Sequence, residues 1–413
     1  MLYEAYELRR TALDLWIEGL EVPVAGLRCL PASLRASYGV RAALAAADVV
    51  GALRLTHDRP DFGVRSVMSG GVDVDVHEEL VARTPFASLI RFAKADGSSR
   101  AQPKVLIVPG LAGHFATLVR ATVSTMLADH DVYVADWHNA RDVPASAGPF
   151  GLDDYIAHLV DFLREMGPGT HVLSVCQPAV ACLVAASVMT QDGDPARPSS
   201  LMLLAGPVDT TVNPSRISRF AQRQSIPMLG RTMLHDVPRQ FAGAGRRVYP
   251  GFAQVSGFMA MDPRRHVDAF RGLFRDLTRG DAEQAQKTLD FYREYFAVLD
   301  IAGEFYLETA QRIFQDNDLP QGRFTWRGRA VDPSLIDSAL FTIEGALDEM
   351  CTPGQTHAAH ALCTGIPPGR RRHLLQEGVG HYGVFAGSTF EREIYPQIRD
   401  FVAEAALPPA GED

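Results

Sequence analysis

His171-Val172-Leu173-Ser174-Val175-Cys176-Gln177-Pro178 is the stretch that decides the fold. Residues 171–175 are predicted to form a strand that ends at Cys176, and residues 179–189 are predicted to form a helix. Pro178 suits the first turn of that helix, where its missing N–H costs little. The stretch therefore predicts a strand, a sharp turn and a helix in direct succession.

The chain on both sides of this stretch alternates between strands and helices. Short apolar runs predict further strands at 105–108, 132–137, 201–205 and 339–343, and such runs are typical of strands buried on both faces of a parallel sheet. Helical patterns around 121–126 and over 152–166 separate them. This alternation predicts an α/β fold with a doubly wound, mostly parallel sheet. Two more strands are expected at 72–80, with one face in water, and at 87–92.

The 413-residue chain is too long for one compact core and divides into segments. Residues 1–60 are predicted to be a helical segment whose apolar residues suit a docking surface or a core face. Residues 61–210 and 330–413 carry the α/β pattern. Residues 211–329 interrupt it with helix formers and aromatic residues, so we expect an inserted, mainly helical cap in which most of these aromatic side chains pack internally.

Ser174-Val175-Cys176-Gln177-Pro178 has the form of a nucleophile elbow. In such an elbow the attacking residue occupies a strained strand-to-helix turn, and small residues two positions before and after it allow close packing. Here Ser174 is small, Pro178 replaces the usual glycine, and cysteine occupies the nucleophile position. The helix N-terminus and a nearby imidazole would favour the thiolate. A buried structural cysteine is the alternative interpretation of this residue.

The order of acidic and basic residues after Cys176 supports the elbow. An α/β-hydrolase fold places nucleophile, acid and histidine in that order along the chain. Asp348 follows the strand at 339–343 and is the preferred acid, whereas Glu349 is expected at the surface. His381 lies in the glycine-rich run Gly378-Val379-Gly380-His381-Tyr382-Gly383. We therefore expect an acyl-transfer enzyme of the α/β-hydrolase fold with Cys176, Asp348 and His381 as its triad.

An oxyanion hole needs backbone N–H groups aimed at the developing charge. Gln177, directly after the nucleophile, is expected to supply one of them. The turn Gly110-Leu111-Ala112-Gly113 is expected to supply the other, with Leu111 as the first choice and Ala112 as the second. His114 could shape the same hole or pack against the loop.

Composition and motifs argue against several other classes of protein. A formal net charge of −9 is unsuited to nucleic acid as the main partner. No cofactor is predicted, because the sequence lacks a dinucleotide fingerprint and a Walker A motif. No metal is predicted either, since nothing completes a ligand set with His357 and His360 at a typical spacing. Five unpatterned cysteines, no signal-like start and no transmembrane segment lead us to expect a reduced, cytoplasmic protein.

The chain resembles the intracellular polyhydroxyalkanoate (polyhydroxybutyrate) depolymerases of bacteria that store polyester granules. The matching stretches span nearly the whole sequence: Met1-Leu2-Tyr3, 113–120, 132–137, 174–178, 247–252, 291–295, Glu344-Gly345-Ala346-Leu347-Asp348 and Gly380-His381-Tyr382-Gly383. The resemblance implies the same triad of Cys176, Asp348 and His381. Ala112 departs from the family, which often carries serine there, so a side-chain role at that position is in doubt.

The resemblance also implies a substrate, a mechanism and a location. Cys176 would attack a polymer ester and form a 3-hydroxyacyl thioester, which water, or coenzyme A as an alternative acceptor, would then release. Polyester granules or 3-hydroxyacyl oligomers would be the partners, and His114 and Tyr382 are candidates for the substrate pocket. Assembly into a homo-oligomer is left open.

Three other functions remain as alternatives to a depolymerase. A polyester synthase also uses cysteine in this fold, but the synthase elbow reads G-x-C-x-G, and Ser174 and Pro178 break both glycines. An esterase for short soluble esters or oligomers would share the triad. A granule-associated protein without activity is the non-enzymatic alternative, which the intact order of Cys176, Asp348 and His381 argues against.

Overall fold

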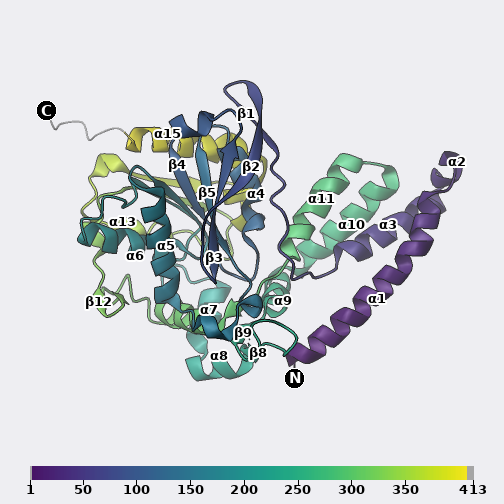
Figure 1. The fold of residues 1–413 in the computed structure, drawn as a ribbon, viewed down its shortest axis with the longest axis horizontal. Coiled ribbons are helices and arrows are strands. Elements are labelled where there is room, and N and C mark those ends of the chain that lie inside the picture. Colours follow the sequence, from purple (N-terminus) through teal and green to yellow (C-terminus); the bar gives the residue numbers. More distant parts are fainter. Residues whose placement is uncertain (1, 407–413) are drawn as a thin grey trace.

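A computed structural model describes residues 2–406 of the chain. The ends of the segments expected at 1–60 and 330–413, Met1 and 407–413, lie outside the described residues, as does the first residue of the Met1-Leu2-Tyr3 match. Within 2–406 a nine-stranded sheet runs in the order β1-β2-β3-β5-β4-β6-β7-β13-β14 (Figure 1). Its strands are β1 (Ser66–Ser69), β2 (Val72–Arg83), β3 (Ala87–Lys94), β4 (Lys104–Val108), β5 (Asp131–Trp137), β6 (His171–Val175), β7 (Ser200–Leu204), β13 (Ala339–Gly345) and β14 (Arg371–Gln376).

The strands from β5 to β14 pair in parallel. The pairs β1–β2, β2–β3 and β3–β5 are antiparallel. The central parallel strands β4, β6 and β7 are buried on both faces, as their apolar runs predicted, whereas β14 at the edge is only partly buried. In β2, by contrast, Val74 and Val76 are buried while Asp73 and Asp75 are exposed. The prediction of a doubly wound, mostly parallel sheet is therefore confirmed.

Helices cover both faces of this sheet and form two separate cores. On one face α5 (Leu152–Met166) and α6 (Ala179–Gln191) pack against inward side chains such as Leu106 and Ala135. On the other face α4 (Arg120–Met126) and α15 (Tyr395–Ala405) pack against Val105, Ile107 and Val134. Successive side chains of a strand point to opposite faces, so apolar strands can pack against helices on both faces of the sheet. This packing on two faces stabilises such sheets.

The region between β7 and β13 departs from the sheet pattern. Its longer helices are α7 (Arg216–Arg223), α8 (Ile226–Thr232), α9 (Gly251–Met261), α10 (Pro263–Arg279), α11 (Ala282–Tyr295) and α12 (Gly303–Thr309), with a π-helical turn, η5 (Ala310–Gln315). A small antiparallel sheet joins β8 (His235–Asp236), β9 (Arg247–Tyr249) and β10 (Ile301–Ala302). Figure 1 places α7, α8 and α9 beyond one end of the main sheet. Most of the aromatic residues of this region are buried or half-buried, as expected, although Phe220 is exposed.

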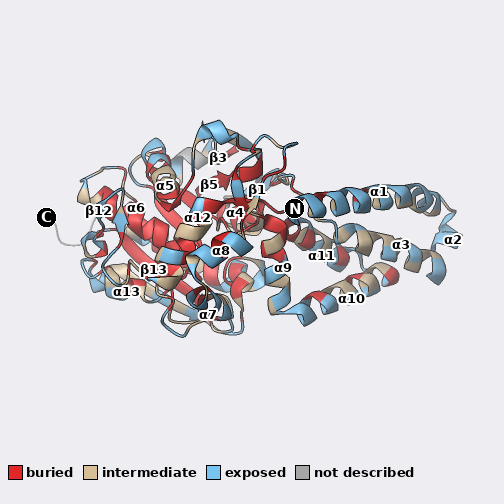
Figure 2. Cartoon of the chain, turned by 90° about the horizontal axis from the view of Figure 1, so that it is seen from below, coloured by how far each residue is buried: buried red, intermediate tan, exposed pale blue. Residues whose placement is uncertain are grey.

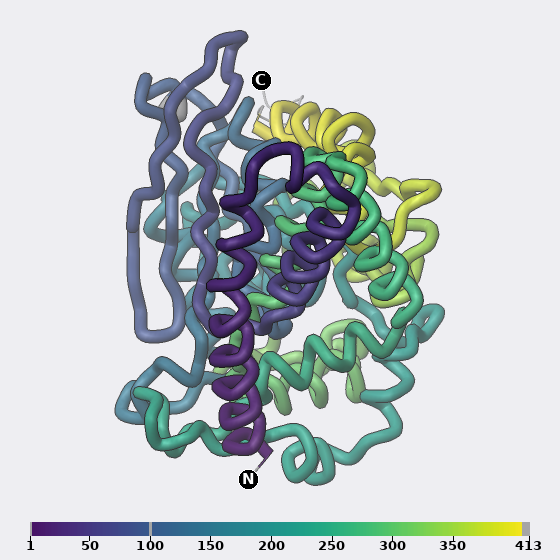
Figure 3. Tube along the Cα trace, turned by 90° about the vertical axis from the view of Figure 1, so that its right-hand side faces the viewer, coloured from purple at the N-terminus to yellow at the C-terminus, as the bar shows by residue number. Residues whose placement is uncertain are grey.

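The N-terminal helices form an arm together with part of the insertion. Helix α1 (Leu2–Arg28) packs on α3 (Tyr38–Ala52), which is reached through the short α2 (Ala32–Arg35) and also contacts α10. Figure 1 shows these helices and α11 projecting away from the sheet, and Figure 3 views the arm from its outer end, with the N-terminal helices in front. Figure 2 shows that much of the arm is exposed, and the exposed side chains include Leu8, Leu13, Leu15 and Trp16. The helical spacing of apolar residues near the N-terminus therefore corresponds to α1, and many of the apolar side chains of α1 are exposed.

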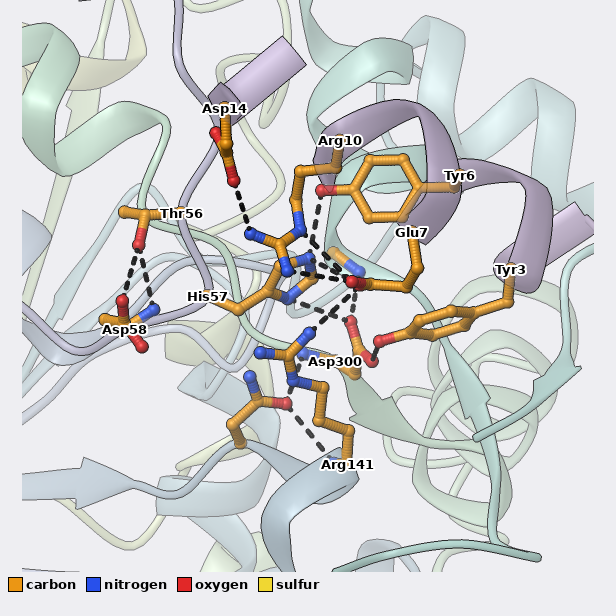
Figure 4. A network of polar contacts seen from close by, with 12 residues as sticks. Tyr3, Tyr6, Glu7, Arg10, Asp14, Thr56, His57, Asp58, Arg141 and Asp300 are labelled. Carbon is orange, nitrogen blue, oxygen red and sulfur yellow. Dashed lines mark hydrogen bonds and ion pairs between the residues drawn. The ribbon is translucent and has the colours of Figure 1, made fainter. Parts of the chain in front are cut away.

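A buried polar network fastens the base of α1 to the rest of the chain (Figure 4). The Tyr3 hydroxyl donates to the Asp300 carboxylate at 2.5 Å, and Glu7 pairs with Arg141 at 3.2 Å. The Tyr6 hydroxyl lies 3.0 Å from His57 Nε2. These contacts join the first turns of α1 to His57, Arg141 and Asp300, which come from three separate parts of the chain, so α1 is anchored at one end. Among residues 2–406, no helix combines the length and the apolar character that crossing a membrane requires.

Candidate active site

Cys176 occupies the turn between β6 and α6. Its φ angle is +67°, a left-handed conformation that a residue with a Cβ adopts only under constraint. The Cys176 N–H donates to the Leu204 carbonyl at 2.8 Å, and the Pro178 carbonyl accepts from the Cys182 N–H at 2.9 Å. Neighbouring strand and following helix therefore fix the turn from both sides. This is the geometry of an elbow that presents one side chain at the end of a sheet.

Close packing beneath the turn explains how the strained backbone is held. A Cβ on Gly206, just after β7, would lie 2.3 Å from the Ala179 Cβ and 3.0 Å from the Cys176 carbonyl oxygen. Only glycine fits at that approach. The small-residue requirement of the elbow is thus met by Gly206 and Ala179 as well as by Ser174, so Pro178 can replace the customary glycine.

Asp348 and His381 lie close together although 33 residues separate them in the sequence. Asp348 follows β13, and His381 opens the short helix η8 (His381–Val384) after β14. His381 Nδ1 lies 2.7 Å from Asp348 Oδ2, and both side chains are buried. The other carboxylate oxygen, Oδ1, accepts from the N–H groups of Met350 and Cys351 at 2.8 and 2.9 Å. The carboxylate is therefore held on both oxygens and orients the ring, as the acid of a triad does.

Cys176 acts on the charge state of His381. Burial by itself lowers the pKa of His381, but the charges of Cys176 and Asp348, together with hydrogen bonds to both, raise it well above its ordinary value. A raised imidazole pKa means that the protonated ring of His381 is favoured beside the Asp348 carboxylate. His381 is therefore a base in contact with the Cys176 side chain, the pairing that a cysteine nucleophile needs.

The remaining cysteines have different surroundings. Cys351 is close enough to influence the candidate site, but burial, followed by the charges of Asp348 and Cys176, raises the pKa of its thiol well above the ordinary value. Burial also raises the pKa values of Cys182 and Cys363 to about 12. Cys29 is exposed. Inert thiols are expected where burial disfavours the thiolate, which leaves Cys176 as the cysteine with a base beside it.

The turn after β4 lies against the elbow, where the sequence led us to expect an oxyanion hole. Leu111 and Ala112 line the same cavity as Cys176 and Gln177. The Leu111 N–H donates to the side-chain oxygen of Gln177 at 3.2 Å, while within residues 2–406 the N–H of Gln177 donates to no protein acceptor. One expected donor is therefore open, and the other is occupied by a side chain that can rotate away.

An apolar cavity of about 540 Å³ lies above these residues. Cys176, Gln177 and His381 form part of its wall, and the insertion supplies most of the remainder through Phe220, Phe258, Met261, Phe305, Tyr306 and Phe314. A cavity of this size and character is typical of sites for small or chain-like apolar ligands. The aromatic richness of 211–329 signalled several of these side chains, but nothing in the sequence singled out Met261 or Phe314.

Neither His114 nor Tyr382, the two side chains suggested for a substrate pocket, is part of this cavity's wall. The His114 ring is buried and stacks on Phe258, with centroids 5.9 Å apart, and burial lowers its pKa to about 4. The Tyr382 ring packs edge-on against Phe291 at 5.9 Å. Both rings pack against aromatic side chains of the insertion instead, whereas Ala112 and His381, from the same two loops, line the cavity.

Sheet and site together define a protein of the α/β-hydrolase fold, with the nucleophile candidate, acid and histidine following β6, β13 and β14 in turn. Residues 205–406 match the family model described as "PHB de-polymerase C-terminus". That region contains the whole insertion, Asp348 and His381. The chain's second half is therefore similar to a family concerned with polyhydroxybutyrate.

The chain is also similar to curated proteins named "Poly(3-hydroxyalkanoate) polymerase subunit PhaC". The protein of Haloferax mediterranei is 22% identical over 294 residues, which cover 69% of this chain and 54% of the relative. The protein of Haloarcula marismortui is 22% identical over 106 residues, covering 26% and 22%. The chain thus spans about half the length, or less, of the curated relatives it matches.

Solved structures with a similar fold include a hydrolase from Pseudomonas aeruginosa, with 13% identity, a TM-score of 0.45 and coverage of 80% of this chain and 99% of that one. A monoacylglycerol lipase from Paleococcus ferrophilus has 13% identity and a TM-score of 0.42, with coverage of 74% and 96%. At these scores the likeness adds nothing to what the sheet topology already shows.

Proposed function

We propose that the chain is a polyhydroxyalkanoate depolymerase that cleaves polymer ester bonds through Cys176, His381 and Asp348. The observation that carries the proposal is the position of Cys176, which lies beside a histidine–aspartate pair in the wall of an apolar cavity. The insertion that supplies most of that wall belongs to the region similar to the depolymerase family model. Polyesters of 3-hydroxy acids are apolar chains with an ester in every repeat, which suits both the nucleophile and the wall.

The geometry supports a two-step reaction. His381, oriented through Nδ1 by Asp348, holds the Cys176 proton, and the thiolate attacks the carbonyl carbon of an ester. The developing oxyanion lies near the Gln177 N–H and, once the Gln177 side chain rotates, the Leu111 N–H. The ester C–O bond breaks, the leaving alkoxide takes the proton from His381, and a 3-hydroxyacyl thioester remains on Cys176.

The second step transfers the acyl group to an acceptor. We propose water, which would lose a proton to His381 as it attacks the thioester and releases free acid with the thiolate. Coenzyme A is the alternative acceptor, since a thioester exchanges readily with another thiol. Acyl-coenzyme A among the products would establish that route, and its absence with coenzyme A present would exclude it.

A polyester-forming acyltransferase is the second candidate function. The similarity to polymerase subunits favours it, because a cysteine thioester serves synthesis as well as cleavage. A polymerase transfers acyl groups onto the growing polyester, whereas a depolymerase transfers them from the polyester to water or coenzyme A. 3-Hydroxybutyryl-coenzyme A, offered without granules, would yield insoluble polymer from a polymerase and at most free acid from a depolymerase.

The test is acid release from native amorphous poly(3-hydroxybutyrate) granules, with and without coenzyme A. Wild-type protein is expected to release acid, and Cys176→Ala is expected to release none. A matched control is Cys182→Ala, which removes a buried thiol from α6, outside the cavity, and is expected to keep activity if the protein stays folded. A folded wild type that hydrolyses short soluble esters but not granules would overturn the proposal in favour of an esterase, and one that does neither would indicate an inactive protein.

Association with polyester granules belongs to the same proposal. The exposed apolar side chains of α1, among them Leu8, Leu15, Trp16 and Val22, would suit an apolar polymer surface. Co-sedimentation with granules through a density gradient would measure it. Wild-type protein that stays at the top of the gradient would remove this part of the proposal and leave the catalytic part standing.

A further inference from the structure

His357, His360 and His373 come together on the outer side of the sheet, away from the cavity. His360 lies in α13 (Ala359–Leu362), His357 lies in the turn before it, and His373 lies on β14. One ring nitrogen of each lies within 4.8 Å of the others, and the rings of His357 and His373 approach to 4.4 Å between centroids. Three imidazoles from three separate positions in the chain therefore share one small volume.

The neighbours of the cluster hold it in place. Thr342, which is paired with His373 across β13 and β14, has its hydroxyl 2.8 Å from His360 Nε2 and 2.9 Å from His373 Nδ1. Each of these two rings keeps a second nitrogen. Metal-binding histidines characteristically use one nitrogen for the metal and the other for an orienting hydrogen bond. The Thr342 hydroxyl is thus positioned as the orienting partner of two rings at once.

One carboxylate and one guanidinium lie beside the cluster, the latter from Arg371, which donates to the His360 carbonyl at 3.0 Å. The buried Glu344 carboxylate lies 3.9 Å from His373 Nε2 and accepts the N–H groups of Thr356 and His357 at 2.7 and 3.0 Å. Its negative charge lies on the inner side of the cluster, while His357 and His373 are exposed on the outer side.

We propose that His357, His360 and His373 bind one divalent transition-metal ion of the zinc class. Imidazole nitrogens lie 2.0–2.1 Å from zinc in proteins, so donor atoms in a tetrahedral site stand about 3.4 Å apart. Small side-chain rotations close the present spacing to that value. Three histidines would leave the fourth position to water from the exposed side.

Such an ion would connect the two loops that carry the acid and the base. The segment from Asp348 leads through the turn at Thr356 to His357 and His360, and β14 leads from His373 to His381. A metal bound to all three histidines would fix the far ends of both loops to each other. Its role would be structural, because the cluster is not part of the cavity wall.

The test is zinc binding to untagged, chelator-treated, full-length protein by titration calorimetry, with Co²⁺ absorption to report the ligand geometry. We expect one ion for each chain, a rise in melting temperature with Zn²⁺, and a loss of affinity of at least about tenfold in His357→Ala and in His373→Ala. Both side chains are exposed, so these variants should fold, and circular dichroism would verify it.

Two controls separate this site from other zinc-binding groups. His77→Ala removes an exposed histidine on β2 and should leave binding unchanged. Cys176→Ala removes the thiol that could bind zinc with His381, and it should also leave one ion for each chain. The proposal is overturned if no ion binds, or if binding survives in His357→Ala and His373→Ala or disappears with Cys176→Ala. None of these readouts depends on depolymerase activity.

Discussion

The side-chain oxygen of Gln177 accepts a hydrogen bond from the backbone N–H of Leu111 at 3.2 Å. The Leu111 N–H is one of the two donors of the candidate oxyanion hole, and this contact occupies it with the uncharged amide of Gln177. The side-chain nitrogen of Gln177 is buried and has no partner among the described residues, so little holds the amide in this rotamer. We infer that the side chain leaves when a substrate oxygen arrives.

Gln177→Ala and Gln177→Glu should therefore differ sharply. The alanine variant keeps both backbone donors, so kcat on a soluble 3-hydroxybutyrate ester should stay within about tenfold of wild type. The glutamate variant places a charged oxygen on the Leu111 N–H, opposite the developing oxyanion, and kcat should fall on the order of 10²–10³-fold. Steady-state kinetics would decide. Equal losses in both variants would mean that the glutamine side chain itself is required.

Asp348→Asn should weaken the base without moving it far. The Asp348 carboxylate helps to raise the pKa of His381, so an uncharged amide lowers that pKa and destabilises the imidazolium beside Cys176. We expect kcat to fall by at least about a hundredfold, and we expect alkylation of Cys176 by iodoacetamide at pH 7 to slow. Glu349→Gln, at an exposed neighbouring carboxylate, is the control. A variant Asp348→Asn that reacts as fast as wild type would contradict the assigned role.

Gly206→Ala should disrupt the elbow. The added methyl group would meet the Ala179 Cβ at 2.3 Å, and overpacking of this kind costs about 1–3 kcal/mol in the free energy of unfolding. Activity should fall further than stability, because the backbone that holds Cys176 must shift. Gly19→Ala in α1, where a Cβ meets nothing within 4 Å, is the matched control and should be neutral or stabilising. Urea unfolding and kcat of both variants would measure this difference.

Stability should decrease as the pH falls below about 6.5. Burial, together with the charges of Arg141 and Arg10, lowers the pKa of His57 to about 2, and burial lowers that of His171 to about 4. An unfolded histidine has a pKa of about 6.5. Below that pH the unfolded chain takes up protons that the folded chain does not, so the free energy of unfolding falls by up to about 1.4 kcal/mol per pH unit for each such histidine.

The contribution of His57 can be measured by difference. The free energy of unfolding in urea at pH 7.5 and 5.5 should change less in His57→Gln than in wild type, because the variant lacks one of these groups. His77→Ala, at an exposed position, should retain the wild-type pH dependence. An identical pH dependence in wild type and His57→Gln would show that this histidine does not titrate as the burial requires.

Local patterns in the sequence predicted the sheet well. The apolar runs at 171–175 and 201–205 coincide with β6 and β7 to within a residue, because strands buried on both faces leave an unambiguous signal. The same patterns could not show that α3 lies against α10, since amphipathic helices far apart in sequence do not encode their partners. They likewise missed the approach of His373 to His357, which depends on the parallel pairing of β14 with β13.

The contact between Tyr3 and Asp300 spans 297 positions of the chain. During synthesis at 5–20 residues per second, the first turn of α1 therefore emerges about 15–60 s before the residue that anchors it. Throughout that interval the Tyr3 ring, which the folded protein buries, faces water on a helix that lacks its anchoring contact. Nascent chains of this protein should consequently depend on chaperones more than the compact sheet alone would require.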